Sequence, residues 1–151
     1  MPVLFDSPEV QARALNAFVK LMRSTNALQG ALLPQLQKEF GLTESQLGVL
    51  ESLHHLGPLS QSDICQKILR GGSNVTTVVD NLERGGLVRR ERGESDRRVQ
   101  VVHLTESGRA LITRAFPIHA ARITRLMAAL DEDEQRELGR LCRKLGTAAN
   151  G

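Results

Sequence analysis

Apolar residues recur at every third or fourth position along most of the chain, with polar residues between them. This spacing places the apolar side chains on one face of an α-helix. Residues 74–84 are an example, where the pattern is carried by Val75, Val78, Val79 and Leu82. The chain is therefore predicted to be mainly helical, with helices near residues 9–28, 34–40, 44–56, 60–69, 74–84, 106–130 and 132–147.

Residues that form helix caps stand at the predicted helix starts. A Ser, Thr or Asp at the N-cap accepts hydrogen bonds from the backbone amides of the first turn. Residues of this kind are Ser7 before Pro8, Thr43 with Gln46, Ser60 with Asp63, Ser73, Thr105, and Asp131 with Glu134. Within the first apolar stretch, Gly30 and Pro34 are helix breakers, so we expect two helices there.

One segment departs from the helical spacing. Residues 87–92 and 97–104 read as strands on either side of Gly93-Glu94-Ser95-Asp96, which predicts a β-hairpin. Two short helices, joined by a tight turn at Gly71-Gly72, come directly before it. This order is typical of a winged helix-turn-helix. The expected fold is mainly α with a small β-hairpin wing and with N- and C-terminal dimerisation helices.

The charge of the chain is concentrated beside the helix predicted over residues 74–84. The 151 residues carry a net charge of +3, and residues 84–98 contain six arginines against three acidic residues. A basic segment on a nearly neutral body indicates an anionic partner. The chain has no Trp and no Tyr, which argues against recognition of bases by stacking.

The polar face of the same helix is suited to DNA. Its short side chains can reach base edges in a major groove, while a basic hairpin beside it supplies phosphate contacts. Either the helix or the hairpin alone could be an ordinary solvent-exposed surface. Because the two are adjacent in the sequence, we favour binding to DNA. The expected contacts are Ser73, Asn74, Thr76, Thr77, Asn81, Arg84, Arg89, Arg97 and Arg98.

The run "NVTTVVDNLERGGLVRRERGESDRRVQVVHLTESG" resembles the MarR family of bacterial transcription regulators. The Asp-x-Arg at Asp96 to Arg98, followed by "LTESG", is similar to the family's wing motif. The resemblance implies a homodimer, a triangular winged-helix fold and a palindromic double-stranded DNA operator. It also implies an ion-pair cluster of Asp80, Asp96 and Arg98 that fixes the wing to the recognition helix. Whether Arg97 or Arg98 enters the minor groove stays open.

The expected organisation is a single domain over residues 1–151. Residues 43–105 form its DNA-binding lobe, and residues 7–30 and 106–147 form dimerisation helices. Apolar stripes lie near both ends of the chain, and a second copy could cover them. Alternatively, the two stripes pack on each other within one chain.

A small-molecule effector is expected in a pocket between the dimerisation helices and the DNA-binding lobe, as the family resemblance implies. The candidate lining is Phe18, Met22, Leu36, Phe40 and His54. The segment "FPIH", which ends at His119, resembles a subgroup that represses aromatic-degradation or quinone-detoxification genes. A repressor released by a phenolic or quinone ligand is therefore expected. His119 alternatively serves as a hydrogen-bonded interface residue.

Cys65 and Cys142 fall in apolar stripes and are expected in the core, which fits a reduced, cytoplasmic protein. No metal, cofactor or enzymatic activity is expected, because we find no ligand cluster, phosphate loop or nucleophile–base pair. No apolar run has the length of a membrane span. Two alternatives remain: a DNA-binding protein that reads shape without a ligand, and a regulator that senses oxidants through cysteine.

Overall fold

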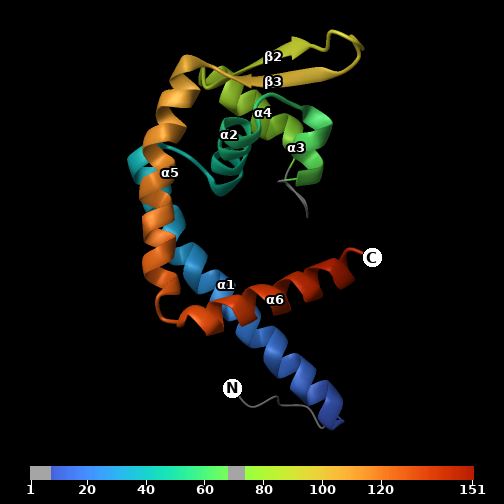
Figure 1. Cartoon of the computed structure of the whole chain (residues 1–151), viewed down its shortest axis with the longest axis vertical. Coiled ribbons are helices and arrows are strands. Elements are labelled where there is room, and N and C mark those ends of the chain that lie inside the picture. Colours follow the sequence, from blue (N-terminus) through green and yellow to red (C-terminus); the bar gives the residue numbers. More distant parts are fainter. Residues whose placement is uncertain (1–7, 68–73) are drawn as a thin grey trace. The chain divides into compact units, whose positions relative to one another are not determined.

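The computed structural model describes residues 8–67 and 74–151, and in these ranges it is mainly helical with one small sheet (Figure 1). The elements in chain order are α1 Glu9–Phe40, α2 Glu44–Leu56, β1 Leu59–Ser60, α3 Gln61–Lys67, α4 Val75–Arg84, β2 Val88–Arg92, β3 Gln100–Leu104, α5 Glu106–Met127 and α6 Glu132–Ala149. The chain divides into two compact units, up to Phe116 and from Pro117. The predicted fold class is confirmed.

Helix α1 is one continuous helix of 32 residues, so the predicted break at Gly30 and Pro34 is wrong. A proline removes the hydrogen bond to the carbonyl four residues earlier, which here belongs to Gly30. The helix continues because its next turns pack against the protein: Leu36 is fully buried, and Phe40 packs against the core. Tertiary packing of this kind outweighs local propensity. Helix α1 ends at Gly41, whose φ of 66° is the left-handed conformation that glycine adopts readily.

The core of the first unit surrounds α2. Leu47, Val49, Leu50 and Leu53 of this helix are buried, so α2 contributes to the core from more than one side. Leu56 differs, with 59% of its surface exposed. Helices α1, α3, α4 and α5 and strands β2 and β3 contribute further buried apolar residues to the same cluster, including Leu36, Ile64, Val79, Leu82, Val88, Val102 and Ile112.

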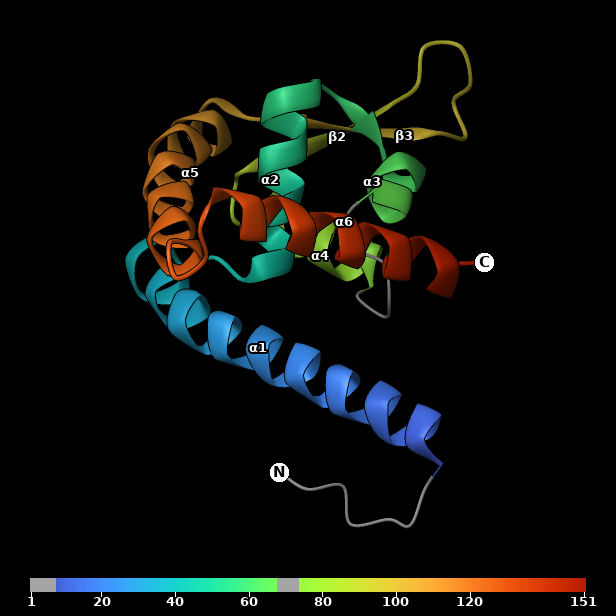
Figure 2. The ribbon, with the colours of Figure 1, turned by 60° about the horizontal axis from the view of Figure 1, so that its bottom comes forward.

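The sheet has three antiparallel strands in the order β1-β3-β2. The two-residue strand β1, which pairs Leu59 with Val102, was not predicted. The second strand was expected to begin at Arg97, but β3 begins at Gln100, so Arg97 and Arg98 lie in the loop between β2 and β3. This loop, residues 93–99, is closed by the Gly93 amide, which donates to the Val99 carbonyl at 2.8 Å. Figure 2 shows the loop extending beyond the helices of the lobe.

Most predicted caps are present. The capping boxes at Thr43 and Asp131 are both complete. The Ser60 hydroxyl accepts from the Asp63 amide at 3.0 Å. The N-cap of α4 is Asn74, one residue later than expected, and its side chain accepts from the Thr77 amide at 3.3 Å. Ser7, Ser73 and the predicted turn at Gly71-Gly72 lie outside the described residues.

Both cysteines are exposed, so their predicted burial is wrong. Helix α3 has seven residues and buries only Ile64, and Cys65 points about 100° away around the helix axis. Helix α6 buries none of its residues within the chain, so Cys142 shares an exposed apolar stripe with Leu141 and Leu145.

The start of α5 is tied closely to the chain before β2. The Thr105 hydroxyl donates to the Gly86 carbonyl at 2.7 Å and accepts from the Gly108 amide at 3.0 Å. A Cβ added at Gly108 would lie 2.0 Å from the Leu87 carbonyl oxygen. Only glycine fits at this position without a shift of the backbone.

We therefore expect Gly108→Ala to lower the free energy of unfolding by about 1–3 kcal/mol. Gly139→Ala on α6 is the matched control, because nothing lies within 4 Å of its added Cβ. Alanine favours a helix over glycine, so this control should gain roughly 0.5–1 kcal/mol. Urea unfolding of both variants measures the difference. A Gly108→Ala variant as stable as the parent would contradict the close contact with Leu87.

Candidate nucleic-acid interface

Helix α4 separates an apolar face from a polar one. Val75, Val79 and Leu82 are at most 8% exposed. Thr76, Thr77, Asn81 and Arg84 are exposed, and so is the capping residue Asn74. The predicted orientation of α4 is confirmed. Its outward face offers hydroxyl, amide and guanidinium groups, which can hydrogen-bond to base edges and phosphates.

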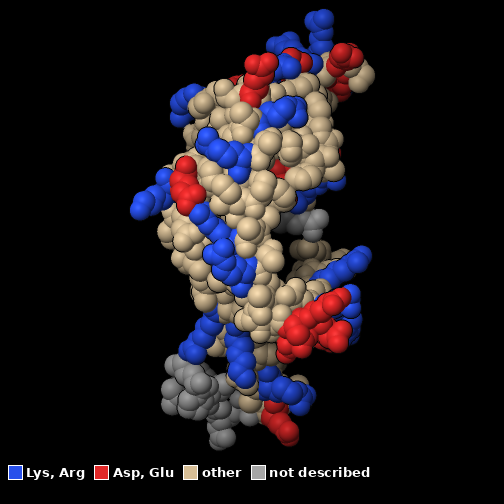
Figure 3. Space-filling model, turned by 60° about the vertical axis from the view of Figure 1, so that its left-hand side comes forward, with Lys and Arg blue, Asp and Glu red and all other residues tan. Residues whose placement is uncertain are grey.

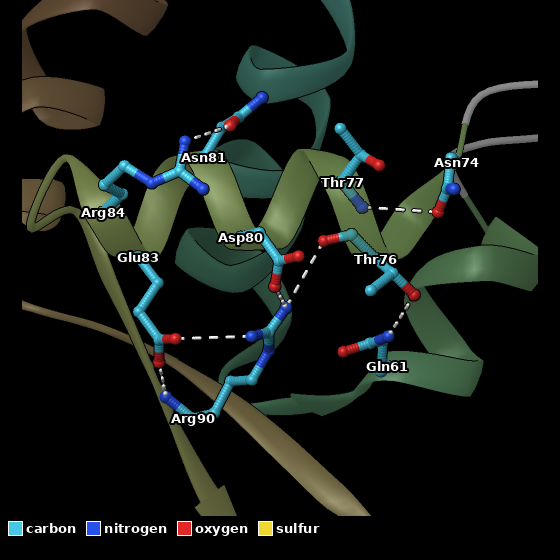
Figure 4. Close-up of polar contacts among 9 residues, drawn as sticks. All are labelled: Gln61, Asn74, Thr76, Thr77, Asp80, Asn81, Glu83, Arg84 and Arg90. Carbon is cyan, nitrogen blue, oxygen red and sulfur yellow. Dashed lines mark hydrogen bonds and ion pairs between the residues drawn. The ribbon is translucent and has the colours of Figure 1, made fainter.

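Arg90 of β2 joins the wing to α4 (Figure 4). Its guanidinium lies 2.5 Å from an Asp80 oxygen and 3.3 Å from a Glu83 oxygen. It also donates to the Thr76 carbonyl at 3.4 Å, and the Arg90 backbone amide donates to Glu83 at 3.0 Å. Only 17% of the Arg90 side chain is exposed. Charge-assisted bonds of this kind, partly shielded from water, are stronger than neutral ones.

The expected cluster of Asp80, Asp96 and Arg98 is divided in two. Asp80 pairs with Arg90, whereas Asp96 pairs with Arg98 at 3.2 Å within the loop. The reason is position: Arg90 lies on β2 beside α4, while Asp96 and Arg98 lie beyond the far end of that strand. The Arg98 backbone amide and then its side chain hold the pKa of Asp96 below its ordinary value. Arg98 was expected to fix the wing to α4, but in the structure Arg90 makes this connection.

The wing arginines differ in their surroundings. Arg98 has 92% of its side chain exposed, although Asp96 orients it. Among the described residues Arg97 has no hydrogen bond or ion pair, and it is exposed. Arg89 pairs with Glu91, which also lies 3.3 Å from His103 Nε2. Figure 3 shows basic and acidic side chains together over the hairpin at the top of the view.

His103 on β3 lies beside this pair. Partial burial, and then the charge of Arg89, lower the pKa of His103 below its ordinary value. The lowered pKa favours the neutral imidazole, so His103 contributes little positive charge to the wing.

The five residues expected to line an effector pocket do not converge within one chain. Phe18 and Phe40 are 22 positions apart on the continuous helix α1, which corresponds to about 33 Å at 1.5 Å per residue. Phe18 and Met22 are exposed, whereas Leu36 is part of the core. A pocket within one protomer can therefore include Phe18 and Met22, or it can include Leu36 and Phe40, but it cannot include both pairs.

Phe40 and His54 have more enclosed surroundings. The Arg114 guanidinium carbon lies 5.7 Å from the centre of the Phe40 ring. His54 packs edge-on against His55, which packs in turn against Phe116, with ring centres 5.3 and 5.1 Å apart. The buried Nδ1 of His54 has no hydrogen-bond partner among the described residues.

Sequence reasoning missed two polar residues of this lobe. Gln61 donates to the Thr76 hydroxyl and lines an open groove of about 380 Å³ with Ser60, Ser62, Arg98, Val99 and Gln100. Arg90 was counted with the hairpin charges and not recognised as the residue that joins β2 to α4. Neither role has a local sequence signal, because each depends on a partner 7 to 15 positions away.

Two further searches of residues 8–67 and 74–151 bear on other kinds of function. No three His, Cys, Asp or Glu side chains there are grouped so that they could hold a metal ion. No helix in the same ranges combines the length and apolar character of a membrane span.

The sheet, the two short helices and the polar face of α4 define a winged-helix DNA-binding protein. Residues 42–99 match the MarR family. The chain is 35% identical to the uncharacterized HTH-type transcriptional regulator YkoM of Bacillus subtilis (strain 168), over 97% of this chain and 94% of the relative. It is 32% identical to the HTH-type transcriptional regulator MhqR of the same organism, over 91% and 94%.

A solved structure agrees with these relatives. The crystal structure of the S. aureus MepR–DNA complex superposes on this chain with a TM-score of 0.74 at 27% identity, covering 87% of this chain and 96% of that one. The chain belongs to the MarR family and is a DNA-binding transcriptional regulator.

The Arg90 contacts predict a specific effect of mutation. Arg90→Met leaves Asp80 and Glu83 without their shared cation, so it should lower the free energy of unfolding by about 1–3 kcal/mol. It should also weaken binding to every DNA sequence, because the wing is no longer held against α4. Arg92→Met, at an exposed position of the same strand, should change stability by less than about 0.5 kcal/mol. Equal stability losses in the two variants would show that Arg90 does not join the elements.

Proposed function

We propose that this protein is a homodimeric, cytoplasmic repressor, without enzymatic activity, that is released from a palindromic operator by a small aromatic ligand. The observation that carries the DNA-binding part is the polar face of α4, held against a wing whose arginines project into solvent. In this proposal α4 enters the major groove and the loop at residues 93–99 reaches the adjacent minor groove.

Exposed apolar surface supports a dimer. On α1, Val10 is 68% and Phe18 58% exposed, and on α6, Leu141 is 47% and Leu145 57% exposed. Apolar faces on helices are normally buried against another element. A second copy covers them and presents two α4 helices related by a two-fold axis. The operator is then an inverted repeat with half-sites about one helical turn apart.

The proposed DNA contacts fall into three kinds. Asn74, Thr76, Thr77 and Asn81 contact the major groove, together with Ser73, which lies outside the described residues. Arg84, Arg89 and Arg97 contact phosphates. Arg98, which Asp96 orients into solvent, enters the minor groove.

The wing assignment is tested by the salt dependence of binding. Arg97→Ala should reduce the slope of log affinity against log salt by about one unit, because one phosphate contact is lost. Arg98→Ala should cause the larger loss of affinity at physiological salt. The measurement is fluorescence anisotropy with the operator, obtained by selection from random duplex DNA. Two variants that bind like the parent at every salt concentration would refute the role of the wing.

An aromatic effector is supported by the side chains near α2. The unpartnered Nδ1 of His54 can hydrogen-bond to a phenol or a quinone, and Leu36, Phe40 and His54 belong to neighbouring helices. Phe18 and Met22 join the site only from a second copy. Such a ligand releases DNA only if it prefers a dimer geometry with a different spacing of the α4 helices.

The exposure of Cys65 makes a second mechanism of release testable, namely oxidation of its thiol. A reversible ligand should release the operator equally well from the parent and from the Cys65→Ser/Cys142→Ser double variant. Gel shifts with a series of phenols and quinones measure this release. Release that disappears in the double variant would establish thiol chemistry. No release of the parent by any of the compounds would contradict an aromatic effector and favour a protein that binds DNA without a ligand.

A further inference from the structure

Gln61, the first residue of α3, makes a side-chain contact between α3 and the polar face of α4 (Figure 4). Its Nε2 atom donates to the Thr76 hydroxyl at 3.0 Å. From the other side, Arg90 donates to the Thr76 carbonyl at 3.4 Å. Thr76 is therefore held at both its side chain and its backbone, while its side chain remains exposed.

The direction of the Gln61 hydrogen bond has a chemical consequence. An amide nitrogen can only donate, and a hydroxyl has one proton and two lone pairs. Gln61 occupies a lone pair of the Thr76 oxygen, so the Thr76 proton is left for another acceptor. DNA offers acceptors of this kind, which are phosphate oxygens and the N7, O6 and O4 atoms of base edges.

The other end of the Gln61 amide supports a role beyond packing. Its Oε1 atom is buried and has no hydrogen-bond partner among the described residues. A buried acceptor in this state costs free energy, and native proteins retain few of them. The same side chain lines the groove that Arg98 and Gln100 border from the wing side. Gln61 thus stands where α3, α4 and the wing loop meet.

We propose that Gln61 is a positioning residue that fixes Thr76 as a hydrogen-bond donor toward DNA. This inference rests on the proposed function and adds to it the direction of one hydrogen bond, in which Thr76 donates to DNA. The acceptor is a base edge or a phosphate oxygen, and both have the same chemistry toward the Thr76 proton.

The test reverses the polarity of the bond. In Gln61→Glu the carboxylate can only accept, so Thr76 gives it the proton that DNA would otherwise receive. Gln100→Glu is the matched control, because it places the same charge in the same groove without a contact to Thr76. Affinity for the selected operator and for random DNA is measured by anisotropy, and folding by thermal melting.

We expect Gln61→Glu to bind the operator roughly 5- to 100-fold more weakly than Gln100→Glu, the range of one lost contact. On a Thr76→Val background the two glutamate variants should bind equally, because Gln61 acts only through the Thr76 hydroxyl. Thr76→Val alone should show the same loss, which tests the contact even if Gln61→Glu does not fold. A loss of affinity confined to the operator identifies a base edge as the acceptor of the Thr76 proton. An equal loss of affinity for random DNA identifies a phosphate oxygen as the acceptor.

Two results would overturn the inference while the protein still binds its operator. One is equal affinity of Gln61→Glu and Gln100→Glu, which would mean that Thr76 does not donate to DNA. The other is a difference between them that persists without the Thr76 hydroxyl. A parent protein that selects no operator would instead contradict the proposed function itself.

Discussion

The guanidinium of Arg90 determines how the two DNA-binding elements of this protein are placed together. It contacts Asp80 and Glu83 on α4 from strand β2, in surroundings that leave 17% of its side chain exposed. Two carboxylates that share one cation at short distance fix both the position and the rotation of α4 beside the strand. The loop beyond β2 then extends from a strand that is already held against α4, so the arginines of the loop need not hold the wing.

This arrangement divides the arginines of the segment by task. Arg90 is structural, Arg89 is paired with Glu91, and Arg97 and Arg98 project into solvent. The polar face of α4 needs little charge of its own, because affinity for DNA comes mainly from phosphate contacts and specificity from base contacts. The number of arginines in the sequence therefore overstates the positive charge that is available to contact DNA.

Outside the DNA-binding lobe, the structure is marked by surfaces that one chain leaves uncovered. Helix α6 buries no residue within the chain, and α1 exposes large apolar side chains. The continuous course of α1 also separates Phe18 from Phe40, so an effector site that uses both ends of the predicted lining has to draw them from two copies. Dimerisation and effector binding are thereby linked in the proposed function.

The sequence by itself determined the features that depend on neighbouring positions: the apolar and polar faces of α4, the capping boxes at Thr43 and Asp131, and the hairpin after Gly85-Gly86. These follow from helical periodicity and from hydrogen bonds three residues apart. Tertiary structure alone decided the unbroken α1, the third strand β1, the exposure of Cys65 and the partners of Arg90 and Gln61. Each of these depends on packing or pairing between residues far apart in the chain, and such contacts override local propensity without leaving a local pattern.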